Sequence, residues 1–145
     1  MRTREDLQEL IDQLGITIHR LEKDFDVDAG GCVWVCYCIS KNMEKRNLNY
    51  KVVVYGFPDS NPKDVWRLAQ EENMCHMSIL TLGQEIGGEI EPDMVKEHGL
   101  TKAVIQMTSD EILKLYEDNE FNGEYDRKNN QTVEEEIDMT FEMVW

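Results

Sequence analysis

The chain has 145 residues, enough for one domain with its own hydrophobic core. It carries 30 acidic and 15 basic residues, which gives a net charge of −15. This negative charge argues against direct nucleic-acid binding through a basic surface and favours cationic or protein partners. No segment approaches the about twenty consecutive apolar residues of a membrane span, so we expect no membrane insertion.

The four cysteines and the N-terminal segment indicate a reducing compartment. Cys32, Cys36 and Cys38 fall on one predicted helix, where disulfides among them would have poor geometry. The first residues are charged and amphipathic, without the apolar region of a secretion signal. We therefore expect free thiols and a cytoplasmic protein.

An amphipathic helix is expected over residues 3–14. Its apolar residues recur at helical spacing, and Thr3 with Asp6 forms a capping start. We expect Gly15 to end or bend this helix. Residues 16–21 fit either a second helix or a strand, and a loop is expected at residues 24–31.

A second helix is expected to begin at Cys32 and to end near residue 46. Gly30 and Gly31 precede the cysteine, and neither glycine nor proline interrupts the helix. A cysteine at a helix N-terminus faces unpaired backbone N–H groups and the positive end of the helix dipole. Both should lower the pKa of the Cys32 thiol, and the N–H groups could bind an oxyanion beside the sulfur. The alternative is an inert cysteine buried in an apolar helix.

The middle of the chain alternates apolar runs with turn residues. The expected elements are a strand at residues 50–55, a loop at 57–62, a surface helix at 62–72, a second strand at 76–82 and a third strand at 84–90. The first strand is the clearest, because it is β-branched and aromatic and closes at Gly56. Gly87 and Gly88 interrupt the third strand.

The C-terminal part predicts mainly helices. The expected elements are a helical turn at residues 92–99, a strand at 103–107, a helix at 109–116, a polar stretch at 118–130 and a closing helix. Ser109 should cap one helix, and Thr132 with Glu135 should form the capping box of the last. Helices followed by a small, mostly antiparallel sheet and a closing helix predict a single α+β domain over residues 1–145.

Nucleophilic chemistry at Cys32 requires a base near the sulfur, and the chain has three histidines. His19 precedes the cysteine helix, and His98 stands at an exposed helix end. His76 begins an apolar strand, where a side chain at the sheet edge can face a helix N-terminus. We therefore predict that His76 pairs with Cys32, the alternative being a surface or capping histidine.

The order of these features resembles the papain-like cysteine peptidases, and more narrowly their transglutaminase-like and NlpC-like branches. Gly30-Gly31-Cys32 begins a helix, a strand follows at residues 50–55, and His76 opens the next strand. The resemblance implies a papain-like core, with the cysteine helix packed on a small antiparallel sheet. It also implies that Cys32 is the nucleophile and His76 the general base.

The stretch at residues 121–129, Phe-Asn-Gly-Glu-Tyr-Asp-Arg-Lys-Asn, extends the resemblance. It is similar to a tryptophan-asparagine, then aromatic-aspartate-arginine pattern of small members of this superfamily, with Phe121 in place of the tryptophan. The resemblance implies a structural role for this stretch, which would tie the last helix to the sheet.

Gly87 departs from the pattern of the family. Relatives carry a carboxylate there that orients the histidine, and glycine has no side chain. Three alternatives remain open: Glu89 or Gln84 orients His76, the enzyme uses a Cys–His dyad, or the site is inactive and the fold serves binding. Asp26 and Asp28 precede the cysteine and should raise the pKa of its thiol, against the effect of the helix end.

Two functions follow from the sequence. The first is a cysteine hydrolase or acyl transferase that acts on an amide or isopeptide bond of a peptide or protein substrate. The second is a non-catalytic acidic interaction protein, either an inhibitor or a nucleic-acid mimic. No cofactor is expected, and no metal is expected because Cys32, Cys36 and Cys38 lack the spacing of a zinc site.

Overall fold

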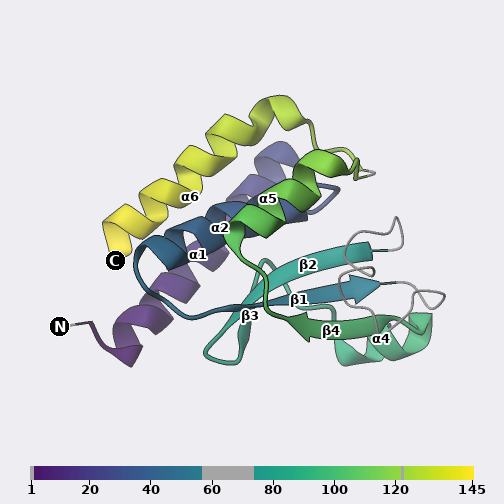
Figure 1. The fold of residues 1–145 in the computed structure, drawn as a ribbon, viewed down its shortest axis with the longest axis horizontal. Helices are drawn as coiled ribbons and strands as arrows, with labels where there is room; N and C mark the ends of the chain where they lie inside the picture. Colours follow the sequence, from purple (N-terminus) through teal and green to yellow (C-terminus); the bar gives the residue numbers. More distant parts are fainter. Residues whose placement is uncertain (1, 57–73, 122) are drawn as a thin grey trace.

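The computed structural model describes residues 2–56, 74–121 and 123–145, which form a sheet with helices stacked on one side of it (Figure 1). The elements in chain order are α1 (Arg4–Phe25), α2 (Cys32–Lys45), β1 (Lys51–Gly56), β2 (Met74–Thr81), β3 (Gln84–Ile86), α4 (Pro92–His98), β4 (Thr101–Ile105), α5 (Ser109–Asp118), η1 (Arg127–Asn129) and α6 (Asn130–Val144). The loop expected at residues 57–62 and the helix expected at 62–72 lie outside the described residues.

The sheet has the strand order β3-β2-β1-β4, and its neighbouring strands are antiparallel. Tyr55 of β1 lies opposite His76 of β2 on one side and opposite Lys102 of β4 on the other. Figure 1 shows α1, α2, α5 and α6 gathered on one side of the sheet and α4 beside the start of β4. The predicted α+β class, with helices first, an antiparallel sheet and a closing helix, is confirmed.

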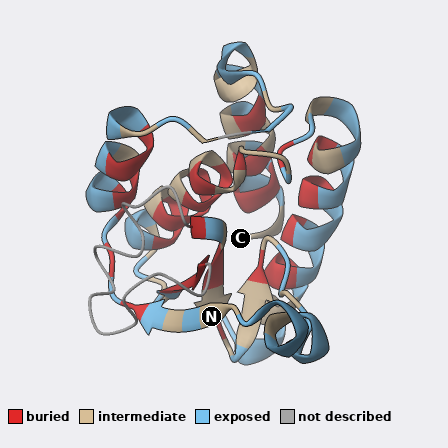
Figure 2. Ribbon diagram, turned by 90° about the vertical axis from the view of Figure 1, so that its right-hand side faces the viewer, coloured by how far each residue is buried: buried red, intermediate tan, exposed pale blue. Residues whose placement is uncertain are grey.

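The hydrophobic core lies between α2 and the sheet. Val35, Ile39 and Met43 recur along α2 at helical spacing and are buried against Met77 and Ile79 of β2 and other core residues. Figure 2 shows the buried residues on the inward sides of the helices and strands. Burying such a side chain contributes about 1.5–3 kcal/mol to the stability of the fold, so packing against the sheet is the main interaction that stabilises α2.

The first helix is longer than the sequence predicted. α1 begins at the predicted cap, where Thr3 and Asp6 form a capping box, but it continues through Gly15. The apolar spacing persists beyond the glycine, and Ile18 and Leu21 are buried on the same face as Leu14. A glycine inside a helix costs about 1 kcal/mol, which this burial outweighs. In the parts of the chain that the structure describes, no helix has both the length and the apolar character needed to cross a membrane.

The predicted capping residues of two helices were wrong, by one residue for α5 and by three for α6. Thr108, and not Ser109, caps α5 and forms a capping box with Glu111. The last helix begins at Asn130, so the predicted cap Thr132 lies inside it. The preceding η1 turn already provides helical geometry, which lets the helix start earlier than its capping residues indicate.

The later strands also differ from their predicted bounds. β3 ends at Ile86, because Gly87 and Gly88 adopt φ angles of 104° and 98° that leave the strand conformation. β4 spans Thr101–Ile105, two residues earlier than expected, and pairs with β1 in that register. The first change shortens β3, the edge strand next to the predicted site, and the second shifts β4 without shortening it.

Burial raises the pKa of all five tyrosines, which are Tyr37, Tyr50, Tyr55, Tyr116 and Tyr125. We therefore expect the folded protein to show less tyrosinate near pH 10 than the urea-unfolded chain. Because the folded state holds these protons more tightly, their contribution to stability is complete below about pH 10 and decreases as the pH rises further. Ultraviolet titration of both states measures this, and coincident curves would contradict it.

Candidate active site

Cys32 lies at the first position of α2, as predicted, and its side chain is only partly exposed. Burial raises the pKa of the thiol above its usual value, although the backbone N–H groups of Met77 and Val33 act on the sulfur in the opposite direction. The prediction that the helix end lowers the pKa of Cys32 was therefore wrong in its net direction. The backbone N–H groups do lower the pKa of the thiol, but the desolvation of the buried sulfur raises it by more.

His76 lies on β2, directly before the residue whose N–H group reaches the sulfur of Cys32. Its Nε2 atom is 2.7 Å from the carbonyl oxygen of Gly88. A carbonyl oxygen only accepts hydrogen bonds, so Nε2 donates and carries the proton. In the neutral imidazole Nδ1 is then the unprotonated nitrogen, which is the form that a general base requires.

The ring of Tyr55 supports the imidazole from the neighbouring strand. The two residues lie opposite each other on β1 and β2, and the ring centroids of Tyr55 and His76 are 5.7 Å apart. This is a common separation for paired aromatic rings. The imidazole is therefore held at Nε2 by a carbonyl and beside the ring by an aromatic side chain.

Cys32 and His76 line the same small pocket. Its volume is about 10 Å³, roughly the space of one water molecule, and Glu22, Asp28 and Gly87 also line it. Although both residues are described, no hydrogen bond between the sulfur and the imidazole is found in the described part of the chain. The sequence thus identified two residues that share a pocket, while their direct contact stays a prediction.

The residues predicted to orient His76 bind elsewhere. Glu89 pairs with Lys102, with 3.6 Å between the carboxylate and the ammonium nitrogen. Gln84 exchanges hydrogen bonds with Gln8 of α1. The backbone carbonyl of Gly88 holds the ring instead, so the missing side chain at position 87 does not leave the imidazole unanchored.

A buried polar cluster lies beside His76 and was not predicted from the sequence. The side chain of Glu85 is 5% exposed and accepts hydrogen bonds from Tyr55 at 2.8 Å, from Ser78 at 2.7 Å and from Lys102 at 3.2 Å. Burial, and then Glu85, raise the pKa of Tyr55 to about 12. The available signal was strand alternation, which places these polar residues on the sheet face of His76.

The acidic residues before the cysteine have different roles. Asp26 ends α1 in a left-handed conformation, with its N–H group donating to the carbonyl of Glu22. Asp28 lies at the Cys32 pocket. Burial raises the pKa of the Glu22 carboxyl, and the negative charge of Asp28 raises it further. The pocket therefore has an acidic margin on its α1 side.

The other histidines and cysteines lie away from this arrangement or are buried. His19 is exposed, 3.9 Å from Glu22, and His98 is exposed at the end of α4. Burial raises the pKa values of Cys36 and Cys38 in α2. Cys75, next to His76, is the exposed thiol of the chain.

Within the stretch at residues 121–129, residues 123–125 pack on the loop before α2. The tie between the last helix and the sheet that the resemblance implied stays a prediction. The N–H group of Tyr125 donates to the carbonyl of Ala29 at 3.0 Å. At Gly31 an added Cβ would meet the ring of Tyr125 at 2.9 Å. The hydroxyl of Tyr125 donates to the side chain of Asn130 at 2.7 Å, at the start of α6. This stretch therefore fixes the backbone that leads into Cys32.

Comparison of the chain with protein-family models, with curated proteins and with solved structures finds no match. Within residues 2–56, 74–121 and 123–145, no three or more His, Cys, Asp or Glu side chains are grouped in a way that could hold a metal ion.

Proposed function

We propose that the protein is a cysteine hydrolase or acyl transferase with a papain-like core, acting on an amide or isopeptide bond. Cys32 is its nucleophile and His76 its general base. The observation that carries the proposal is that His76, whose Nε2 donates a hydrogen bond to the Gly88 carbonyl, is a lining residue of the pocket of Cys32. This hydrogen bond selects the tautomer with a basic Nδ1, which is the orienting role of the third group in a catalytic triad.

In the proposed reaction, Nδ1 of His76 takes the proton of the Cys32 thiol while the sulfur attacks the carbonyl carbon of the substrate. The carbonyl electrons move to the oxygen, and the N–H groups at the start of α2 stabilise the oxyanion. The imidazolium then gives its proton to the leaving amine as the C–N bond breaks. Water or a second amine attacks the resulting thioester and releases the thiol.

The raised pKa of Cys32 is compatible with this reaction because the thiolate forms together with the imidazolium. The N–H group of Met77 stabilises the thiolate, and the carbonyl of Gly88 stabilises the imidazolium. Catalytic hydrogen bonds are often long in substrate-free enzymes and tighten when substrate binds. His76 shares a sheet face with Tyr55 and Ser78, whereas Met77 and Ile79 on the other face pack against α2. The proposal therefore requires the imidazole to swing around the sheet edge toward the pocket of Cys32.

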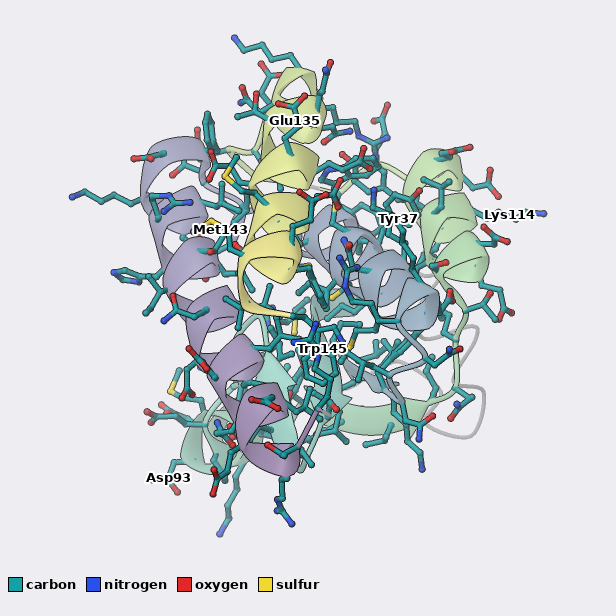
Figure 3. The ribbon with its side chains drawn as sticks, turned by 90° about the vertical axis from the view of Figure 1, so that its left-hand side faces the viewer. Tyr37, Asp93, Lys114, Glu135, Met143 and Trp145 are labelled. Carbon is teal, nitrogen blue, oxygen red and sulfur yellow. The ribbon has the colours of Figure 1, made fainter. Side chains whose placement is uncertain are left out.

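The second candidate is a non-catalytic acidic interaction protein. The observations that favour it are the small volume of the Cys32 pocket and the raised pKa of the thiol. A nucleic-acid mimic would concentrate its acidic side chains on one face. Figure 3 instead shows Asp93 and Glu135 at opposite ends of the view, and Glu9 and Asp110 are exposed on two further helices. This candidate is therefore better described as an inhibitor or adaptor than as a nucleic-acid mimic.

Iodoacetamide labelling tests the proposed pair. At about pH 6, a thiol activated by His76 should react faster than Cys75, which is exposed but whose pKa is raised by partial burial. His76→Ala should slow labelling of Cys32 by about ten-fold or more, because the base that accepts the proton is lost. Peptide mass spectrometry of timed reactions measures the rate at each cysteine.

His98→Ala is the matched control, because His98 is exposed at the end of α4 and does not line the pocket. It should leave the rate at Cys32 unchanged. Slow labelling of Cys32, equal to that of buried Cys36 and Cys38 and unaffected by His76→Ala, would exclude acyl-transfer chemistry and favour the second candidate.

A further inference from the structure

A groove of about 550 Å³ runs between α1 and β3, directly beside the Cys32 pocket. We call it the α1–β3 groove; it extends from Ile11 to Glu22 on the helix and from Gln84 to Gly88 on the strand side. Ile18, Glu22 and Gly87 line both the groove and the pocket. The groove therefore ends at the proposed nucleophile, and its volume is in the range of ligand sites.

Gly15 keeps the helix side of this groove open. It lines the groove in the middle of α1, and a Cβ added there would meet no other atom within 4 Å. Alanine would stabilise the helix by about 1 kcal/mol at this position, so packing does not require the glycine. A longer side chain would extend into the groove without a clash at its Cβ.

The strand side of the groove is a sheet edge. β3 is the terminal strand in the order β3-β2-β1-β4, and its ladder partner is β2. An edge strand has backbone N–H and C=O groups that a further strand can pair with. Extended peptides bind to such edges by adding a strand, and neighbouring side chains provide the selectivity.

The charge of the groove is negative. Asp12 and Glu22 line it, while the charge of Glu85 is paired with Lys102. The lining residues, all within the described part of the chain, include His19 but neither lysine nor arginine. A basic side chain in the groove would therefore meet carboxylates, and an acidic one would be repelled.

We propose that the α1–β3 groove binds an extended peptide segment with lysine or arginine side chains and delivers it to Cys32. The segment pairs with the edge of β3, and its basic side chains reach Asp12 and Glu22. This inference rests on the proposed function, because it names the substrate class of that site. The two carboxylates mark different ends of the groove, because Glu22 lies at the Cys32 end and Asp12 lies away from it.

The first test measures binding without catalysis. A fluorescein-labelled hexapeptide of alternating alanine and lysine is titrated with the protein, and fluorescence anisotropy gives its Kd against that of the glutamate counterpart. We expect Gly15→Met to raise the Kd of the lysine peptide by about ten-fold or more, because the side chain fills the groove. Gly15→Ala is the matched control and should keep the Kd of the wild-type protein.

The second test separates the groove from the general negative charge of the protein. Asp12→Asn with Glu22→Gln should also raise the Kd by about ten-fold. Glu135→Gln with Glu142→Gln removes the same charge from exposed positions of α6, away from the groove, and should change the Kd little. Glu135 projects from the outer end of α6 in Figure 3.

The outcomes distinguish this inference from the proposed function. Equal effects of the two charge pairs, or equal Kd values for Gly15→Met and Gly15→Ala, would overturn the groove as the peptide site even if Cys32 alkylates rapidly. Groove-dependent binding with an unreactive Cys32 would retain the peptide site and refute the hydrolase. Selective binding and selective alkylation together would support both.

Discussion

Gly123→Ala is expected to lower the free energy of unfolding by about 3 kcal/mol or more. A Cβ atom at this position would lie 1.9 Å from the carbonyl oxygen of Ala29 and 2.2 Å from its carbonyl carbon. Both are backbone atoms, which cannot rotate away as the end of a side chain can. The variant must therefore separate the two segments and lose the hydrogen bond from Tyr125 to Ala29. Urea denaturation followed by circular dichroism measures the loss.

Gly83→Ala is the control for backbone strain. Gly83 has a φ of 68°, but a Cβ added there would meet no atom within 4 Å. Alanine should cost about 1–2 kcal/mol at this position, the penalty of a left-handed conformation alone. If Gly123→Ala were no more destabilising than Gly83→Ala, the close approach of residues 123–125 to the loop before Cys32 would be wrong.

The start of α2 could be predicted because its signals are local. Gly30 and Gly31 break the chain, and the uninterrupted apolar run behind them specifies a buried helix that begins at Cys32. The strands at 51–56 and 74–81 were also found, since β-branched and apolar runs bounded by turn residues identify them. Cys32 and His76 line one pocket, and the predicted contact between sulfur and imidazole stays a prediction.

The anchoring of His76 could not be predicted, because its partner is a backbone carbonyl. The carbonyl of Gly88 reaches the ring because the chain leaves β3 through two glycines with positive φ. A search for an orienting side chain led instead to Glu89 and Gln84. Every residue has a carbonyl, so residue type carries no information about which one binds the imidazole.

The packing of residues 123–125 on the cysteine loop is likewise absent from any local pattern. About ninety residues separate Gly123 from Ala29, so only the folded chain brings them together. α1 was shortened in the prediction for a related reason. The local effect of Gly15 is unfavourable to a helix, and the tertiary burial of Ile18 and Leu21 reverses it.

The imidazole of His76 depends on a second layer of contacts. Gly88 binds its Nε2 atom, Tyr55 packs beside its ring, and the hydroxyl of Tyr55 is held by Glu85. Since Tyr55 and Ser78 are fully buried, their hydroxyl groups depend on this carboxylate for hydrogen bonding. Glu85 therefore links the stability of the sheet to the position of the proposed base.

Glu85→Ala is expected to lower the free energy of unfolding by about 3 kcal/mol, because it leaves two buried hydroxyl groups without their acceptor and removes the nearer of the carboxylates that pair with Lys102. Glu85→Gln is the matched control; it keeps an acceptor of similar shape and should lose about 1 kcal/mol. Chemical denaturation measures both values.

Removal of the negative charge should also be visible at Tyr55. Glu85 contributes to the raised pKa of that tyrosine, so in Glu85→Gln the pKa should decrease from its value of about 12. The difference between the ultraviolet titrations of Glu85→Gln and of Glu85→Gln with Tyr55→Phe isolates this group. If the free energy of unfolding of Glu85→Ala were within about 0.5 kcal/mol of that of the wild-type protein, Glu85 would contribute no more to stability than a typical surface residue. The hydrogen bond between His76 and Gly88 would then still hold the imidazole. The packing of Tyr55 beside the ring would not depend on Glu85.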